Sequence, residues 1–410
     1  MIDRTIKNVV IETIKNKPVT LITGARQVGK TTLCKIIMED MNFNYVSLDD
    51  LRERSLAITD PEMFLKLHNW PLIIDEIQYA PGLFDVIEAL VNKQKFDTGN
   101  NYGMFVLTGS QSYNLMQGVS QSMAGRIGIV KMSPLSYSEI SGVEENPFSI
   151  DLQTIQKRTK KHKLDVNDLY KNIVRGFYPE LYDNKKLDYN SFYADYVNSY
   201  IEKDVSQLIN LNDKLKFQKF IELLASMTGE ELIYSNLSKI IGININTVKS
   251  WISVLVAGDI ITLIEPYYED SITKRITKRQ KIVFNDTGLA CYLARLNDSE
   301  TLRRSRFAGH FVETYIINEI IKSYHNNNQI FNAFYYRDSN LNEIDLIILQ
   351  NGILTPIECK SGVSYNSSDV SGFKQIDFSK YDIGTGAVIC NTDSIYVIKE
   401  KVYAIPITAI

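Results

Sequence analysis

The sequence lacks long apolar runs, grouped cysteines and any large excess of charge of one sign. No segment approaches the run of about 18 or more apolar residues that a membrane-spanning helix needs, so we expect no membrane partner. The cysteines show no C-x-x-C spacing, which argues against a zinc site and a disulfide framework; they are Cys34, Cys291, Cys359 and Cys390. The net charge of −3 excludes a uniformly basic nucleic-acid coat, so any nucleic-acid surface must be local. These features predict a soluble, cytoplasmic protein.

The length of 410 residues exceeds one ordinary domain, since domains usually contain about 100–200 residues. In the first part, five apolar runs alternate with helical patterns, at residues 19–24, 43–50, 70–77, 102–110 and 128–135. Continuous runs rich in β-branched residues and separated by helices are typical of a parallel sheet covered on both faces. The sequence therefore predicts a nucleotide-binding α/β domain over residues 1–135.

The stretch "TGARQVGKTTLCK" follows the first apolar run and matches the phosphate-binding pattern G-x-x-x-x-G-K-[ST]. Its glycines let the backbone N–H groups point at phosphate oxygens, and the helix that follows adds its positive dipole end. Lys30 is expected to reach the β- and γ-phosphates, and the Thr31 hydroxyl to bind magnesium. We expect ATP to contact Gly24, Ala25, Arg26, Gln27, Val28, Gly29, Lys30, Thr31 and Thr32.

Three further strand ends carry candidate catalytic residues. "LIIDEI" places Asp75 where it can hold magnesium and Glu76 where it can polarise the attacking water, which argues for hydrolysis. In "LTGSQS", Thr108 or Ser110 could sense the γ-phosphate, although a simple turn explains them too. Arg126 in "MAGRIGIV" is a candidate arginine finger, for its own site or a neighbouring subunit's nucleotide; the alternative is a structural arginine.

The middle of the chain reads as three helices and a hairpin. A turn at Gly242 separates two helices, and Ile240, Val248 and Leu255 fit apolar packing, as does Trp251. On the outward face of the second helix lie Asn246, Thr247, Lys249 and Ser250, as in a recognition helix that reads the major groove of DNA. A basic stretch, a candidate wing for phosphate contacts, follows with Lys274, Arg275, Lys278, Arg279 and Lys281. A protein-docking or purely structural role is the alternative for this segment.

The last part begins with a helix and continues with strands. Asp345 ends one expected strand, and Glu358 and Lys360 lie on the next, where alternation puts both side chains on one face. This is the pattern of the PD-(D/E)XK nucleases, in which carboxylates bind magnesium and a lysine activates water. Glu313 in the preceding helix could add a third carboxylate. The same fold can also bind nucleic acid without cleavage or serve as an inert scaffold.

Together these motifs make the chain resemble the AAA+ ATPases of bacteria and archaea that carry a C-terminal domain of unknown function with a nuclease-like fold. The resemblance rests on "GARQVGKTTL", "LIIDEIQ", "FVLTGSQS", "MAGRIGIVKMSPLSYSE", "RGFYPEL", "YIEKDV", "NTVKSWISVL", "FNDTGLACYL", "NEIDLI" and "PIECKSG". It implies ATP binding and hydrolysis, and it places Arg126 at the finger position and Arg175 at a sensor position in a helical lid.

The predicted fold class is α/β, built from an AAA+ P-loop parallel sheet (1–135), a helical lid (136–215), a winged helix (216–300) and a restriction-endonuclease-like α/β domain (301–410). One hypothesis is an ATPase that couples nucleotide state to DNA engagement by the winged helix and the nuclease-like domain. The other is a nucleotide-dependent switch that recruits a protein partner, with a catalytically inert nuclease-like fold. ATP and magnesium are the expected cofactors in both.

Overall fold

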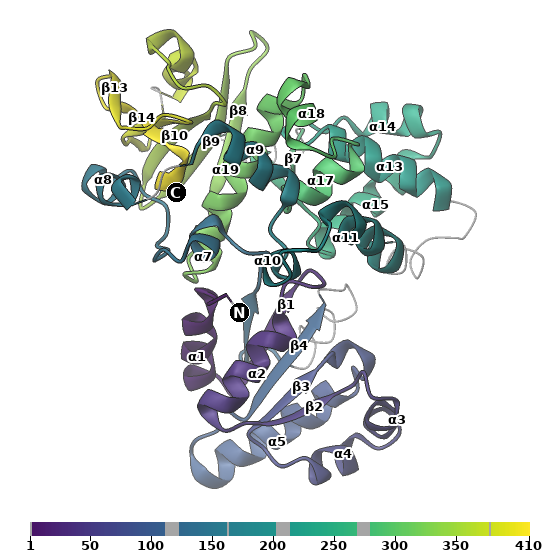
Figure 1. Ribbon diagram of the computed structural model, residues 1–410. Coiled ribbons are helices and arrows are strands. Elements are labelled where there is room, and N and C mark those ends of the chain that lie inside the picture. Colours follow the sequence, from purple (N-terminus) through teal and green to yellow (C-terminus); the bar gives the residue numbers. More distant parts are fainter. Residues whose placement is uncertain (1, 111–122, 162–163, 202–213, 269–278, 377–378) are drawn as a thin grey trace.

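The computed structural model describes residues 2–110, 123–161, 164–201, 214–268, 279–376 and 379–410. Its N-terminal part is a five-stranded sheet in which every adjacent pair is parallel, with strand order β2-β3-β4-β1-β5 (Figure 1). The strands are β1 (Val19–Gly24), β2 (Asn44–Ser47), β3 (Leu72–Asp75), β4 (Phe105–Ser110) and β5 (Ile127–Lys131). The parallel sheet predicted from the five apolar runs is confirmed.

Helices cover both faces of this sheet because its central strands, β3, β4 and β1, are buried almost throughout. The helices are α1 (Ile6–Asn16), α2 (Lys30–Met41), α3 (Leu51–Thr59), α4 (Pro61–Leu67) and α5 (Leu83–Thr98), with a short turn η1 (Ile77–Tyr79). Alternate residues along β1 enter different cores: Ile22 packs with α1 and α2, whereas Leu21 packs with α3, α4 and α5. Burial on both faces explains why these strands are continuous apolar runs in the sequence.

A helical segment connects this part to the rest of the molecule (Figure 1). It contains α7 (Tyr137–Ser141), α8 (Leu152–Lys161), α9 (Val166–Arg175), α10 (Pro179–Asp183) and α11 (Tyr189–Tyr196), which continues into η2 (Val197–Ile201). Helix α7 begins with a capping box, in which Ser136 and Glu139 each accept from the other's backbone N–H.

The remaining chain builds helices around a nine-stranded sheet, with the order β13-β14-β12-β10-β9-β8-β6-β7 and β11 beside β10. The strands are β6 (Ile261–Pro266), β7 (Lys281–Phe284), β8 (Ala333–Arg337), β9 (Glu343–Gln350), β10 (Ile353–Cys359), β11 (Asp382–Ile383), β12 (Gly386–Cys390), β13 (Tyr396–Lys399) and β14 (Val402–Pro406). The helices are α13 (Lys214–Ser226), α14 (Tyr234–Ile241), α15 (Ile245–Ala257), α17 (Thr287–Leu293), α18 (Ser299–Arg304) and α19 (Ala308–His325), with short turns η4 (Ser367–Ile376) and η5 (Ile407–Ala409).

The antiparallel pair β6–β7 belongs to the middle of the chain, yet β6 also pairs in parallel with β8 of the last part. One sheet therefore crosses residue 300, where a domain boundary was expected. Helix α19 fixes this body to the N-terminal part. Its Glu319 accepts a hydrogen bond of 2.6 Å from the Tyr137 N–H, and its Lys322 donates one of 2.9 Å to the Leu135 carbonyl.

Among the described residues, no single helix is long and apolar enough to cross a membrane; α14 and α15 pass that test only as a pair bent by 105°. In α15, Val248, Trp251 and Leu255 are buried as predicted, and Trp251 contacts Phe217 and Phe220 edge to face. The expectation for Ile240 was wrong, because its side chain is 65% exposed on α14.

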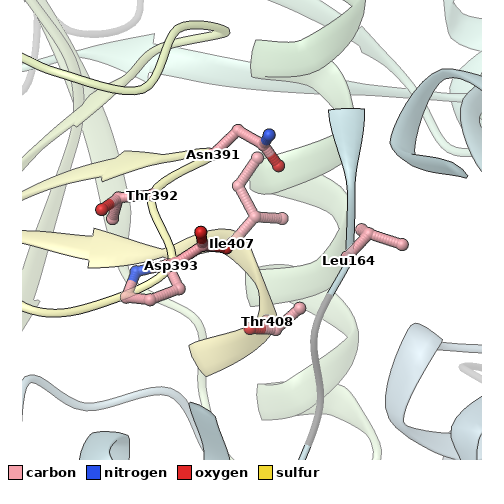
Figure 2. A pocket seen from close by; sticks show the side chains of 7 residues that line it. Leu164, Asn391, Thr392, Asp393, Ile407 and Thr408 are labelled. Carbon is pink, nitrogen blue, oxygen red and sulfur yellow. The ribbon is translucent and has the colours of Figure 1, made fainter. Parts of the chain in front are cut away.

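A small cavity lies between the start of α9 and the C-terminal strands (Figure 2). It is lined by Leu164, Asn391, Thr392, Asp393, Pro406, Ile407 and Thr408. Its volume of about 10 Å³ is at the lower limit for one water molecule, so it offers no room for a larger ligand.

Candidate functional site

The loop between β1 and α2 has a backbone that requires glycine at both ends. Gly24 has a φ of +145°, and Gly29, the residue before α2, has a φ of +97°. A Cβ atom on Gly24 would lie only 2.1 Å from the carbonyl oxygen of Met132. The first turn of α2, beginning at Lys30, holds no acidic residue, so its positive end remains available to an anion. This arrangement suits a loop that wraps a phosphate group.

Lys30 is folded back onto this loop. Its Nζ donates to the carbonyl oxygens of Gly24, at 3.1 Å, and Ala25, at 2.7 Å. Burial lowers the pKa of Lys30 to about 8, while the nearby carboxylates of Glu76 and Asp75 act in the opposite direction. The ammonium group is therefore held by weak neutral acceptors in a poorly solvated place, where a phosphate would be a stronger partner.

Asp75 ends β3 and gathers three hydroxyl groups. Its Oδ2 accepts from Thr31 Oγ1 at 2.9 Å and from the Tyr45 hydroxyl at 2.8 Å, and its Oδ1 accepts from Thr108 Oγ1. Thr31 and Asp75 thus present neighbouring oxygen ligands of the kind Mg²⁺ prefers. Tyr45 was missed in the sequence, because only the parallel pairing of β2 with β3 brings it to Asp75.

Glu76 follows directly and adopts a left-handed conformation, with φ of +61°. Such a conformation is uncommon for a residue with a side chain, and it turns Glu76 out of the line of β3. Its backbone N–H donates to Thr108 Oγ1 at 3.2 Å, and its carboxylate accepts from Gln78. Gln78 also donates to Ser110 Oγ at 3.4 Å. Burial raises the pKa of Glu76.

Lys30, Thr31 and Glu76 open onto a cavity of about 550 Å³, large enough for a nucleotide. The predicted residues that line it are Arg26, Gln27, Gly29, Lys30, Thr31, Thr32 and Glu76. Ala25 and Val28 are buried in the core behind the loop instead. The lining that sequence reasoning missed is Asp49, Tyr79, Pro179, Glu180 and Asp183. Asp49 lies just beyond β2, so the strand-end argument used for Asp75 would have found it.

Comparison with known families agrees with this geometry. Residues 16–141 match a family model described as an AAA domain. This part of the chain is similar to AAA-type P-loop ATPase domains, and we call it the AAA domain. Residues 308–410 match a domain of unknown function, DUF4143, and residues 166–300 match another, DUF8612. The AAA domain supports ATP binding and hydrolysis, for which Mg²⁺ is the usual metal partner of the phosphates.

Two curated relatives are similar in sequence over most of the chain. The proteins named Uncharacterized protein Rv2008c, of Mycobacterium tuberculosis, and Uncharacterized protein Mb2031c, of Mycobacterium bovis, are each 23% identical over 339 residues. The match covers 82% of this chain and 68% of each relative.

Similarity to solved structures is distant. The Walker-type ATPase PABY2304 of Pyrococcus abyssi is 15% identical, with a TM-score of 0.39, over 72% of this chain and 96% of that chain. A RuvB variant of Thermotoga maritima is 16% identical, with a TM-score of 0.33, over 64% and 89%. Scores this low do not establish a shared overall fold.

Arg126 lies far from the cavity of its own AAA domain. It precedes β5, and its carbonyl accepts from the N–H of Val19 at the amino end of β1, opposite the phosphate loop. The length of β1 separates the two ends by roughly 17 Å. Its guanidinium pairs with Glu88 of α5 at 3.0 Å. A finger role within the same chain is therefore contradicted, and a role toward a neighbouring subunit stays a prediction.

Arg175, the expected lid sensor, does not line the cavity. It stacks 5.2 Å from the Tyr182 ring and donates to the Leu181 carbonyl. The part of the helical segment that does reach the cavity is α10, through Pro179, Glu180 and Asp183.

The predicted DNA-contacting face of α15 is accessible. Asn246, Lys249 and Ser250 are exposed, and Thr247 is half-buried. Of the expected basic wing, Lys274, Arg275 and Lys278 lie outside the described residues. Arg279 is exposed and forms an ion pair of 3.4 Å with Glu231.

Lys281 contradicts the wing prediction, because its side chain is only 1% exposed. As the first residue of β7 it points into the C-terminal body, where its Nζ lies 2.6 Å from Glu313 Oε1, 3.3 Å from Glu343 Oε1 and 4.0 Å from Asp345 Oδ1. Burial alone would lower the pKa of Lys281, but the surrounding carboxylates, Glu313 first, raise it above its ordinary value.

The four residues of the predicted nuclease site, Glu313, Asp345, Glu358 and Lys360, do come together. Lys360 Nζ lies 2.6 Å from Glu358 Oε2 and 3.7 Å from Asp345 Oδ2. The backbone N–H of Cys359 donates to Asp345 Oδ2 at 2.8 Å. Lys281 and Glu343 join these four residues, so that acidic and basic side chains alternate. We call the set of six the acid–lysine cluster.

The acid–lysine cluster differs from a metal centre in its charge balance. Burial raises the pKa of Glu313 to about 8, and burial together with Asp345 raises the pKa of Glu358 to about 9. Two ammonium groups occupy the space among the carboxylates. Within the described parts of the chain, no group of three or more His, Cys, Asp or Glu side chains is arranged to hold a metal ion. The magnesium predicted for this cluster therefore does not fit it as it stands.

Proposed function

We propose that this chain is an ATP-hydrolysing AAA switch, in which nucleotide state changes how the remaining domains are held and thereby recruits a protein partner. The observation that carries the proposal is the convergence of Lys30, Thr31 and Glu76 on one cavity whose opposite wall belongs to α10, with Asp75 directly behind Thr31. A nucleotide in that cavity would contact the AAA domain and the helical segment together.

Each residue of the AAA domain has a role that its position supports. Lys30 would leave its carbonyl partners to bind the β- and γ-phosphates. Thr31 and Asp75 would hold Mg²⁺, which neutralises phosphate charge when it is bound with the nucleotide. Glu76 would orient and polarise the attacking water, and Thr108 would keep Asp75 and Glu76 in register.

The residues around α10, which forms the far wall of the cavity, are hydrogen-bonded to Asp286 in the middle of the chain, and these contacts support a switch. Phe177, two residues before α10, donates its N–H to Asp286 Oδ2 at 2.7 Å. The Tyr193 hydroxyl donates to Asp286 Oδ1 at 2.8 Å, and the Leu289 N–H donates to the same oxygen at 2.8 Å. Movement of α10 toward a nucleotide would therefore pull on the residues that begin α17.

The decisive experiment separates nucleotide binding from hydrolysis. Glu76→Gln should bind ATP with little change in affinity and lose about a hundredfold or more in turnover, because it removes a base and leaves the phosphate contacts. Lys30→Ala should lose binding. The control is Glu62→Gln, an exposed acid on α4. Unchanged hydrolysis in Glu76→Gln would mean that the catalytic assignment is wrong.

A second candidate function is DNA engagement by the middle segment. Helices α14 and α15 meet at 105°, within the range of helix-turn-helix units, and α15 presents Asn246, Lys249 and Ser250 outward. Fluorescence anisotropy with labelled duplex DNA tests this idea. Lys249→Glu should weaken binding more than Lys219→Glu, an exposed position on α13, and DNA should raise the ATPase rate. If the two variants bind DNA equally well, the result favours a switch that does not engage DNA through α15.

The acid–lysine cluster supports an inert role better than a nuclease role, because Lys281 and Lys360 already lie among its four carboxyl groups. We expect no magnesium-dependent cleavage of single-stranded or duplex DNA by the full chain. Cleavage by the wild type that disappears in Asp345→Ala and in Lys360→Ala would reverse this conclusion.

A further inference from the structure

Asp259 is a buried carboxylate that reaches the AAA domain from the middle of the chain. It follows α15, has a left-handed φ of +59° and is only 3% exposed. Its Oδ1 lies 2.6 Å from Lys131 Nζ, at the end of β5. The backbone N–H of Ala25, in the phosphate-binding loop, also donates to this carboxylate. A residue outside the AAA domain thus touches the loop that receives the phosphates.

On its other side, Asp259 is joined to the β6–β7 pair. Asn285 Nδ2 donates to Asp259 Oδ1 at 2.8 Å and to the Asp259 carbonyl at 2.9 Å. Thr262 of β6 donates to Asn285 Oδ1 at 2.7 Å. Because β6 pairs with β8, these bonds connect Asp259 to the nine-stranded sheet.

The charges around Asp259 are shared with the phosphate site. Burial raises the pKa of Asp259, whereas Lys131 and then Lys30 favour its ionised form. Lys30 Nζ is held at the Ala25 carbonyl, on the residue whose N–H binds Asp259, so the charge of Lys30 acts on this carboxylate across one residue of the loop. A phosphate would take Lys30 for itself and bring further negative charge toward the buried carboxylate.

We propose that Asp259 couples phosphate occupancy of the AAA domain to the end of α15 and the β6–β7 pair, because a bound phosphate takes up the charge of Lys30 and adds negative charge beside the loop that the Asp259 carboxylate contacts. This coupling rests on the proposed function. Nucleotide binding weakens the Asp259 contacts, and by thermodynamic reciprocity loosening those contacts strengthens nucleotide binding.

The test measures the affinity of a fluorescent, non-hydrolysable ATP analogue with Mg²⁺. Asp259→Asn removes the competing charge and keeps the side-chain size, so the Kd should fall, by about fivefold or more, as in typical coupled sites. Lys131→Met leaves Asp259 more dependent on Lys30 and should raise the Kd. In the double variant, Lys131→Met should have a much smaller effect, because its partner is already neutral. Glu300→Gln, an exposed acid on α18, is the charge-matched control.

Hydrogen exchange supplies a readout on the other side of the contact. In the wild type the analogue should speed amide exchange over residues 257–266, and in Asp259→Asn this response should be lost. If Asp259→Asn does not fold, two readouts still test the coupling: the Kd of Lys131→Met for the analogue, and amide exchange over residues 257–266 in the wild type.

The outcomes distinguish this inference from the function on which it rests. Normal analogue binding with equal Kd values in wild type, Asp259→Asn and Lys131→Met would overturn the coupling and leave the ATPase intact. A wild type that does not bind the analogue would overturn both.

Discussion

Lys281→Met should strongly destabilise the C-terminal body, because it removes the cation at the centre of the acid–lysine cluster. Lys281 is 1% exposed and lies within 4.0 Å of the carboxylates of Glu313, Glu343 and Asp345. Methionine retains most of the length of the lysine side chain, so the substitution mainly removes the positive charge. Glu313 has Lys281 as its close cation, at 2.6 Å, and would be left buried and charged or forced to hold a proton.

The expected loss follows from what happens to the stranded carboxylate. Removing one partner of a buried ion pair usually costs about 3–5 kcal/mol of stability. Loss of Lys281 also removes the cation that lowers the pKa of Glu313, so this carboxyl group takes up a proton more readily and we expect a loss at the lower end of this range, about 3 kcal/mol. Glu313→Gln should cost less, because Lys281 keeps Glu343 and Asp345. The double variant should recover much of the loss, since it leaves no stranded charge.

Urea unfolding at pH 7, followed by Trp251 fluorescence, measures this effect directly. Trp251 is buried among Phe217 and Phe220, while the other tryptophan, Trp70, is 43% exposed and can be replaced by phenylalanine. Lys219→Met, at an exposed position on α13, is the control and should change stability by less than about 0.5 kcal/mol. A loss below about 1 kcal/mol in Lys281→Met, or strict additivity in the double variant, would refute the reasoning.

Two further predictions concern the phosphate loop and the pH dependence of stability. Gly24→Ala should abolish nucleotide binding, because its Cβ would lie 2.1 Å from the Met132 carbonyl oxygen. The control Gly99→Ala also has a positive φ but has open space around its Cβ, so it should bind nucleotide normally. Equal nucleotide binding by the two variants would contradict the steric argument. Glu358 has its pKa raised to about 9 by burial and by Asp345, so the folded protein holds this proton more tightly than the unfolded chain and stability should fall as pH rises from about 4.5 to about 9. The urea midpoint should fall less between pH 5 and pH 9, with pH 7 between them, in Glu358→Gln than in the exposed control Glu400→Gln. Each pKa unit by which the folded and unfolded states differ corresponds to about 1.4 kcal/mol of stability.

The AAA part could be predicted in detail because its information is local. A parallel strand buried on both faces is a continuous apolar run, and the phosphate loop is a single stretch of sequence. The positions of Lys30, Thr31 and Glu76 around one cavity, and of Asp75 beside Thr31, follow from strands that end at the same edge of a sheet. The same argument rules out a finger role for Arg126 within its own chain, because Arg126 precedes its strand and so lies at the other edge of the sheet.

The environment of Lys281 could not be predicted, because it depends on contacts between distant segments. In the sequence, Lys281 is one of several basic residues in a polar stretch, which is typical of a solvated hairpin. Its burial depends on β6 pairing with β8, which brings β7 beside α19 and β9. Asp259 escaped notice for the same reason, since neither Lys131 nor Ala25 is near it in the sequence.

These two unpredicted residues lie on one structural path. Asp259 joins the phosphate loop to Asn285 and Thr262, next to the ladder in which β6 pairs with β7. Lys281 begins β7 and binds Glu313 of α19, whose later residue Glu319 holds the N–H of Tyr137. Because the Asp259 contacts end on the β6–β7 pair, we expect a change at Asp259 to reach this sheet through Asn285 and Thr262. The ion pairs of the acid–lysine cluster hold β7, β9, β10 and α19 together. This structural role fits its buried charges better than a site that must open to admit a metal ion and DNA.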